Sequence, residues 1–198
     1  RAGGAVPSNE PMKLYDREKD TVEHCGKTYK LNLCWQNVLA SLDALDDPEL
    51  SEQIKIEVAL ANLIIGKHPD EPKLLEKVVK TIFPDTPKNS GEPVIDFEQD
   101  SPLIFSAFWQ AYRINLHTDA LTWREFTELL QGIPRGTRLA DRIEIRQREI
   151  PEPTKYNAKE RAALIKAKTE VAIKKTQGQK EKALRGLYSM LEAQAKGR

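Results

Sequence analysis

Residues 96–134 read DFEQDSPLIFSAFWQAYRINLHTDALTWREFTELLQGIP, and this stretch decides the fold class. Eight of the thirteen aromatic residues of the chain lie in it or just before it. Its apolar side chains recur every three or four positions, which places them on one face of a helix. The stretch therefore predicts helices with a buried aromatic face.

The ends of these helices are also marked in the sequence. Ser101-Pro102 predicts a helix start, because proline is favoured in the first helical turn, and this helix is expected to run to about Arg113. Thr122-x-x-Glu125 is the pattern of a capping box and predicts a second helix over residues 123–131. Thr137 is expected to cap a further short helix.

The first half of the chain predicts a hairpin and three more helices. Alternating residues on either side of Cys25-Gly26-Lys27 predict a short β-hairpin, with Gly26 supplying the positive backbone angle of the turn. Asn32 and Ser51 are expected to cap two helices, and Asp70-Glu71-Pro72 to begin a third. The expected inward faces are Trp35, Val38, Leu39, Leu42 and Leu45; then Ile54, Val58, Leu60, Ile64 and Ile65; then Leu74, Leu75, Val78, Val79, Ile82 and Phe83.

The predicted organisation has three parts. Residues 1–11 are expected to be a flexible N-terminal segment or non-native residues, residues 12–150 a helical domain with the hairpin, and residues 151–198 a basic helical tail. This tail holds twelve Lys or Arg against five Glu, with Asn157 as its expected cap. The fold class is therefore predicted as mainly α, a helical bundle with a short N-terminal β-hairpin and an extended C-terminal helical tail.

The residues suggest no catalytic or cofactor chemistry. Asp96 and Asp100 flank a predicted helix start, where carboxylates stabilise free amides, so capping is favoured over acid–base catalysis. The histidines and cysteines lack the spacing of metal ligands, and the adjacent His24 and Cys25 are expected to be poor partners for one ion. We expect no catalytic, cofactor-binding or metal site, and an enzyme is the least favoured class.

Two surfaces are predicted to bind a partner. Most of the aromatic stretch is expected to be core, but Trp109, Trp123 and Arg124 are residue types enriched at interaction hot spots. In the tail an apolar stripe at helical spacing resembles an amphipathic docking helix, and its members are Leu184, Leu187, Tyr188 and Leu191. Basic residues around this stripe leave nucleic-acid binding open, although solvated helix faces explain most of them.

Composition excludes two further classes. Mean hydropathy is −0.57, and no run of about 18 apolar residues could cross a bilayer, so no membrane partner is expected. Arg1 to Pro11 lacks the apolar core of a signal peptide, and the two cysteines are expected to be free thiols in a reducing cytoplasm.

From Met12 to about Ile173, the order of motifs resembles a tail-gene family of siphophages that is known as gene product fifteen in a Listeria-type phage. The resemblance rests on the hairpin motif Val22-x-x-x-Gly26-Lys27-x-Tyr29, the Leu31-Asn32 pair before Trp35, Asp96-Phe97 with Asp100, Ile104-Phe105 with Phe108, Tyr112-Arg-Ile-Asn-Leu116, Trp123-x-x-Phe126-x-x-Leu-Leu130, Ile133-Pro134-x-x-Thr137, and Arg146 with Ile150. The chain departs from the family at Thr122, where an aromatic residue is usual, and in its long tail beyond Ile173.

The resemblance implies a gene between those of the tail tube and the tape measure, where tail assembly chaperones are usually encoded. It implies a non-enzymatic chaperone in the host cytoplasm that binds the tape-measure protein or the major tail protein, with homo-oligomers allowed. The alternatives are a structural virion protein of the tail or neck and a nucleic-acid-binding accessory protein.

Overall fold

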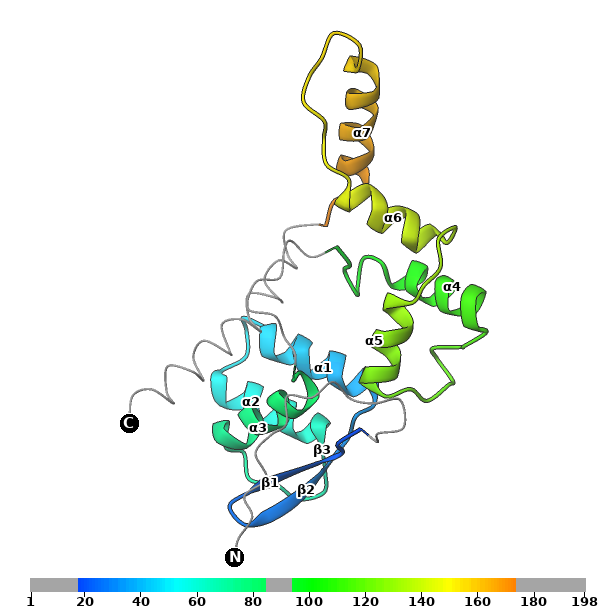
Figure 1. The fold of residues 1–198 in the computed structure, drawn as a ribbon. Coiled ribbons are helices and arrows are strands. Elements are labelled where there is room, and N and C mark those ends of the chain that lie inside the picture. The colour runs from blue at the N-terminus through cyan, green and yellow to red at the C-terminus, as the bar shows by residue number, and fades with distance from the viewer. Residues whose placement is uncertain (1–17, 85–93, 174–198) are drawn as a thin grey trace, which may run out of the picture.

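The computed structural model describes residues 18–84 and 94–173, which form two groups of elements and a projecting helix (Figure 1). The first group contains β1 (Thr21–His24), β2 (Lys27–Leu31), α1 (Trp35–Asp46), α2 (Glu52–Leu63), β3 (Ile64–Ile65) and α3 (Pro72–Ile82). The second contains α4 (Ser101–Tyr112), α5 (Trp123–Gln131) and α6 (Arg138–Gln147), and α7 (Ala158–Val171) projects from it. The mainly α class is confirmed.

The predicted hairpin is confirmed, and a third strand extends it. β1 pairs antiparallel with β2 from Thr21 opposite Lys30 to His24 opposite Lys27. The turn consists of Cys25 and Gly26, whose φ angles are 50° and 74°. β3 pairs antiparallel with the other edge of β2. The prediction that Ile64 and Ile65 continue the α2 helix is wrong, because the helix ends at Leu63 and the chain turns into this strand.

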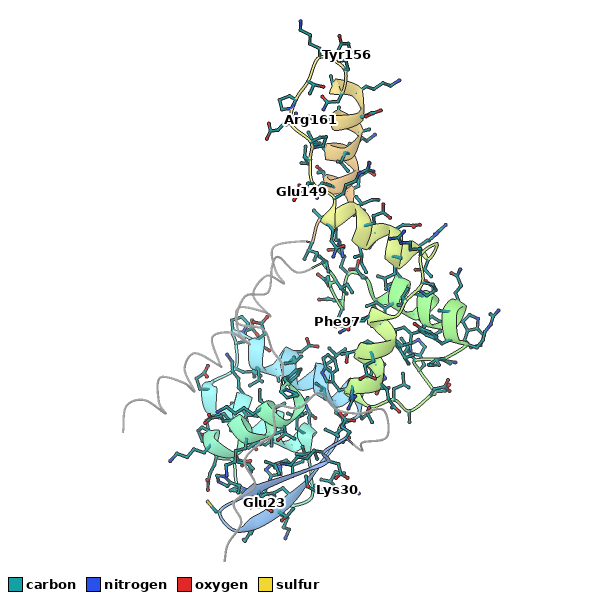
Figure 2. All side chains as sticks on the ribbon, viewed as in Figure 1. Glu23, Lys30, Phe97, Glu149, Tyr156 and Arg161 are labelled. Carbon is teal, nitrogen blue, oxygen red and sulfur yellow. The ribbon has the colours of Figure 1, made fainter. Side chains whose placement is uncertain are left out.

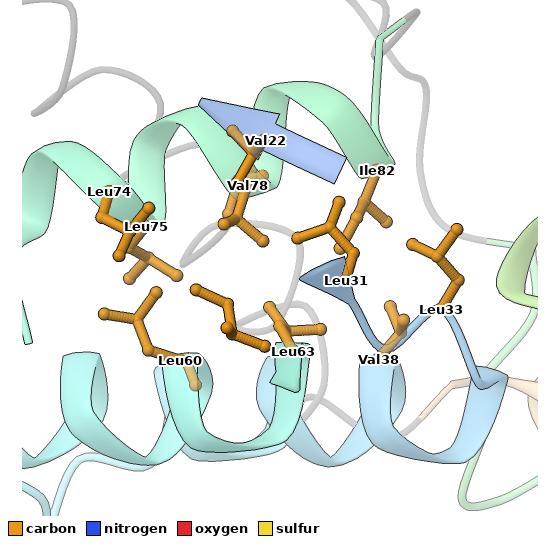
Figure 3. Packing of buried hydrophobic residues seen from close by; sticks show 13 residues of the cluster. Val22, Leu31, Leu33, Val38, Leu60, Leu63, Leu74, Leu75, Val78 and Ile82 are labelled. Carbon is orange, nitrogen blue, oxygen red and sulfur yellow. The ribbon is translucent and has the colours of Figure 1, made fainter. Parts of the chain in front are cut away.

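The first core lies between the sheet and the helices α1, α2 and α3 (Figure 3). The expected face of α3 is confirmed, since Leu74, Leu75, Val78, Val79 and Ile82 are all buried. For α2 and the strand after it, the inward prediction is confirmed for Leu60 and Ile64 but is wrong for Ile65, which is exposed. Ile56, Ala59 and Leu63 supply the rest of the α2 face. Ile54, which was expected inside, is exposed.

The second core is built on the aromatic stretch. Phe126 of α5 stacks between Trp35 of α1 and Phe108 of α4, with ring centroids 4.6 and 5.3 Å away. Phe108 and Phe126 are fully buried, as predicted for the helical stripe. Around them pack Ile104, Ala107, Leu116, Leu130 and Leu139. Aromatic burial of this kind supplies much of the hydrophobic stabilisation of a small core.

The predicted helix caps are confirmed at Ser51, Thr122 and Thr137, whereas those at Asn32, Asn157 and Asp70 are wrong, and α3 begins after Glu71. Ser51, Thr122 and Thr137 each accept a bond from a backbone amide three residues on, and Thr122 forms the full capping box with Glu125. α1 instead begins after Cys34, whose amide donates to the Asn32 side chain. Asn157 precedes α7 but does not cap it, because its amide group bonds Thr154 N and Glu152 O.

The two groups are joined at the start of α5. The Trp123 amide donates to Leu33 O at 2.7 Å, and the Trp35 amide donates to Leu121 O at 3.2 Å. The Trp123 ring packs against both cores, with Phe83 on one side and Phe97 and Phe126 on the other. Backbone bonds and two tryptophan side chains, Trp123 and the Trp35 ring stacked on Phe126, therefore hold the groups together.

Candidate protein-interaction surface

The second group carries a projecting arm, which we define as residues 150–173. The chain leaves α6, runs outward past Tyr156 and returns through α7, so that α7 stands clear of the rest of the described fold (Figures 1 and 2). None of the residues of α7 is buried. Helices of globular domains normally bury one face, so this helix offers surface for contact with another molecule.

Exposed apolar side chains concentrate on this arm. Six large hydrophobic side chains are exposed among residues 18–84 and 94–173, and three of them, Ile150, Tyr156 and Ile165, belong to the arm. Tyr156 is 95% exposed at its far end. A tyrosine presents a large rigid face together with one polar group, which suits it to protein contacts.

The arm is held firmly at its base by two cationic side chains. The Lys168 ammonium donates to the carbonyl oxygens of Ile145, Arg146 and Arg148 at 3.4, 2.6 and 2.6 Å. These carbonyls belong to the last turn of α6 and the residue that ends it, where the helix leaves acceptors free and attracts a positive charge. Arg146 Nε donates to Val171 O at 2.7 Å. The end of α7 is thus fastened to the end of α6.

Asp100 also holds the base of the arm in place, through its contacts with Arg142 and Arg146. Its fully buried carboxylate accepts from both Nη atoms of Arg146 and from Arg142 Nη1 at 2.7 Å. Burial alone would raise the pKa of Asp100, but the bonds from Arg146, the Asp96 amide and Arg142 hold that pKa below its ordinary value. The expected capping role is therefore wrong for Asp100, whose side chain makes no cap, whereas Asp96 accepts from the Glu98 and Gln99 amides.

An open groove of about 970 Å³ lies beside the arm, between α5 and α6. Its lining mixes apolar side chains, Val94, Ile95, Leu130, Ile133, Ala140 and Ile143, with polar and charged ones, Thr127, Gln131, Arg135, Asp141, Glu144, Gln147 and Arg148. Such a groove can contact both faces of an amphipathic helix or segment. The groove and the base of the arm share α6, so one partner could contact both.

The residues that the sequence predicted for partner binding lie in different environments. Trp109 is 47% exposed on the outer face of α4 and remains a candidate. Trp123 is half-buried in the joint between the cores, and Arg124 pairs with Glu128 at 2.7 Å on the surface of α5. The structure does not bring the three into one patch with Tyr156. Leu184, Leu187, Tyr188 and Leu191 lie outside the described residues.

The sequence predicted a helical tail from residue 151, but it did not predict that this tail is anchored to α6 and projects from the fold, or that a groove lies between α5 and α6. Residues 150–156 have little apolar periodicity. No pattern in the sequence therefore predicted that their side chains would be exposed on a projecting segment. Arg146 was noted only as part of a motif, because its bonds to Asp100 and Val94 span 46 and 52 residues of sequence. A polar residue of this kind is found only when the fold is known.

The fold and this surface define a class of protein: a mainly α domain with a small sheet and an anchored, solvent-exposed helical arm. The family model described as Bacteriophage Gp15 protein matches residues 14–173. The chain belongs to this phage protein family, as its motifs suggested. The match includes the whole arm. No curated protein and no solved structure matches the chain.

None of the helices in the described ranges is sufficiently long and apolar to cross a membrane.

Proposed function

We propose that this phage protein is a non-enzymatic tail assembly chaperone that acts in the host cytoplasm. In this proposal it binds subunits of the tape measure or of the tail tube before they assemble. The observation that carries the proposal is the anchored arm, which presents Tyr156, Ile150 and Ile165 to solvent beside the partly apolar groove between α5 and α6. The family membership supplies the phage context.

The physical basis of the proposal is helix recognition. An amphipathic client helix could place its apolar face in the α5–α6 groove while the arm covers its flank. Such a contact would hide apolar surface that otherwise drives aggregation.

The charge of the arm favours a protein partner over nucleic acid. From Pro151 to Ile173 there are five Lys or Arg and three Glu. Lys168 is occupied by three carbonyl groups, and Arg161 Nε bonds Pro151 O at 3.2 Å. Binding to phosphates requires several free cations on one face, and their number here is small.

Co-expression with the tape-measure protein or the major tail protein of the same phage tests the proposal. We expect the full chain to keep one of these clients soluble and to co-purify with it. The double variant Tyr156→Ala/Ile165→Ala should lose this effect. The control, Ile54→Ala/Ile65→Ala, removes two exposed apolar side chains away from the arm and should retain it.

Two outcomes would overturn the proposal. Client solubility that does not depend on this protein excludes a chaperone role. Stoichiometric presence of the protein in purified virions, measured by mass spectrometry, would instead favour the alternative of a structural tail or neck component. Light scattering of the purified chain decides separately whether it forms the homo-oligomer that the resemblance allows.

A further inference from the structure

A second cluster of chemically active side chains lies at the opposite end of the described fold, where the hairpin turn meets the start of α3. His24 ends β1, Cys25 opens the turn, and Glu71 is the residue immediately before α3. The ligand atoms of these three residues all lie within 4.8 Å of one another. The sequence argued against a metal here, because His24 and Cys25 are adjacent and the third residue, Glu71, follows His24 by 47 residues.

Neighbouring contacts hold the three residues in place. Lys77 Nζ of α3 donates to Glu23 O at 2.8 Å, which fixes the turn against the helix. Glu71 occupies the N-cap position but does not cap the helix. Its Oε2 instead lies 2.8 Å from His24 Nε2. A carboxylate that could stabilise free helix amides is thus directed at the imidazole.

His24 itself is unusual. It is 4% exposed, and its Nδ1 is buried without a hydrogen-bond partner. Its only described side-chain partner is Glu71, so the ring faces the cluster through Nε2. A buried polar atom without a partner is uncommon, and an ion or water nearby is one explanation for it.

Cys25 contributes a strained backbone conformation and a thiol sulfur, which is a soft metal ligand. Its φ of 50° lies in the left-handed region, where hairpin turns favour Asn, Asp or Gly. A non-glycine residue there is strained, and such strain collects at functional positions. Its side chain is exposed and is not part of a disulfide. The thiol is therefore free to lose its proton to a metal.

From this arrangement we propose that His24 Nε2, Cys25 Sγ and a Glu71 carboxylate oxygen bind one Zn²⁺ ion. Tetrahedral zinc with bonds of about 2.0–2.3 Å separates its ligand atoms by roughly 3.3–3.6 Å, which small side-chain rotations reach from the present positions. A thiolate and an imidazole select zinc over Mg²⁺ and Ca²⁺. Water takes the fourth position on the exposed side.

Binding has a defined proton balance. The Cys25 thiol releases its proton to solvent. In the metal-free protein His24 donates its Nε2 proton to Glu71. On binding, that proton moves to Nδ1, or to solvent if both nitrogens carry one, so that a neutral ring presents its Nε2 lone pair to the metal. Glu71 exchanges its contact with His24 for the ion. The ion then links the hairpin to α3 and stabilises this end of the first core.

Cobalt substitution tests the site directly. The full chain, purified without metal, is titrated with Co²⁺ and then with Zn²⁺. We expect a thiolate-to-cobalt charge-transfer band that saturates at one ion per chain and disappears when Zn²⁺ displaces Co²⁺. Cys25→Ser should abolish this band, and Glu71→Gln should weaken Zn²⁺ affinity by at least about tenfold, the lower end of losses seen on removing supporting groups.

The other cysteine provides the matched control. Cys34→Ser removes a thiol whose Sγ bonds Gln36 at 2.7 Å, and it should leave the titration unchanged. A second control, His68→Gln, removes a histidine that pairs with Asp70 at 3.3 Å. The proposal is overturned if the unmodified chain shows no charge-transfer band, or if Cys25→Ser retains it while Cys34→Ser loses it. Circular dichroism of each variant confirms that it folds.

Discussion

Asp100 illustrates how much a single buried charge matters in this fold. Its carboxylate has no exposed surface and faces two arginines, one of which also holds Val94 O and Val171 O. The side chain of Arg146 is 6% exposed, so its charge has no access to water if the carboxylate is removed. Loss of one partner of such a pair is far more costly than loss of both.

We therefore expect Asp100→Asn to reduce the free energy of unfolding by about 3–5 kcal/mol at neutral pH. Urea denaturation measures the change, and the control Glu57→Gln removes an exposed carboxylate of α2. A loss no greater than that of the control would contradict the ion-pair argument.

The same carboxylate predicts a pH dependence. The pKa of Asp100 is lowered in the folded state from an ordinary value of 3.8. Its stabilisation is therefore complete above pH 3.8 and is lost as the pH falls through the lowered folded value. The difference in stability between the unmodified chain and Asp100→Asn should narrow over that acidic range. A difference that stays constant there would show that charge is not its cause.

Sequence reasoning reached the neighbourhood of Asp100 but not its role. Its position before Ser101-Pro102 correctly predicted a helix start, because capping patterns are local. Its partners Arg142 and Arg146 follow it by 42 and 46 residues, and no periodicity connects charges across such distances. The approach of Glu71 to His24 was not predicted either, because the two residues are 47 positions apart in the sequence.

At the scale of elements, α5 depends on its capping box. Thr122 Oγ1 accepts from the Glu125 amide at 3.2 Å, and the Glu125 carboxylate accepts from the Thr122 amide at 2.8 Å. We expect Thr122→Ala to reduce stability by about 1 kcal/mol in thermal unfolding, and Thr122→Ser to restore most of it. Thr118→Ala, in the exposed loop before α5, is the control and should change stability by less than about 0.5 kcal/mol.

The arm has its own local test. Lys168→Met keeps the aliphatic stem but removes the ammonium that bonds three carbonyls of the α6 end. Amides of α7 should then exchange with deuterium much faster, while those of α3 keep their protection, because the arm contributes little to either core. Lys166→Met, on the same helix and exposed, should leave exchange unchanged. Equal exchange rates of the α7 amides in Lys168→Met and Lys166→Met would show that the Lys168 ammonium does not anchor the arm.

Sequence patterns predicted elements best where one face is fully buried. The α3 stripe and the aromatic stripe are strongly periodic, and both are confirmed. The pattern failed at α2, where Ile54, Ile56 and Val58 allow more than one face and the end of the helix turns into β3. A two-residue strand is too short for any alternation to reveal it.

At the scale of the whole molecule, the two cores depend on each other through Trp123. Its ring reaches Phe83 of the first group at 5.7 Å and Phe97 of the second at 6.3 Å. We expect Trp123→Ala to cost about 3 kcal/mol and to separate unfolding into two transitions in calorimetry. Trp109→Ala, at an exposed position, should leave one transition. A single transition in both variants would show that the backbone bonds and the Trp35–Phe126 stack couple the groups without Trp123.

The overall architecture was predictable only where it is determined by local sequence patterns. Helix content, the hairpin and both buried stripes follow from local patterns. The division into two cores and the projection of α7 depend on contacts between distant segments, such as the Cys34–Thr122 bridge between the groups. The candidate interaction surface belongs to this second kind, because exposure of Tyr156 is a property of the assembled fold.

The intrinsic fluorescence of the three tryptophans can also report on partner binding. Trp35 is stacked on Phe126, Trp123 is enclosed between the groups, and Trp109 faces solvent. In Trp109→Phe the remaining emission should be blue-shifted and poorly quenched by acrylamide, whereas in the unmodified chain one component is readily quenched. Protection of that component on adding a client would show, without any label, that the α4 face is covered in the complex.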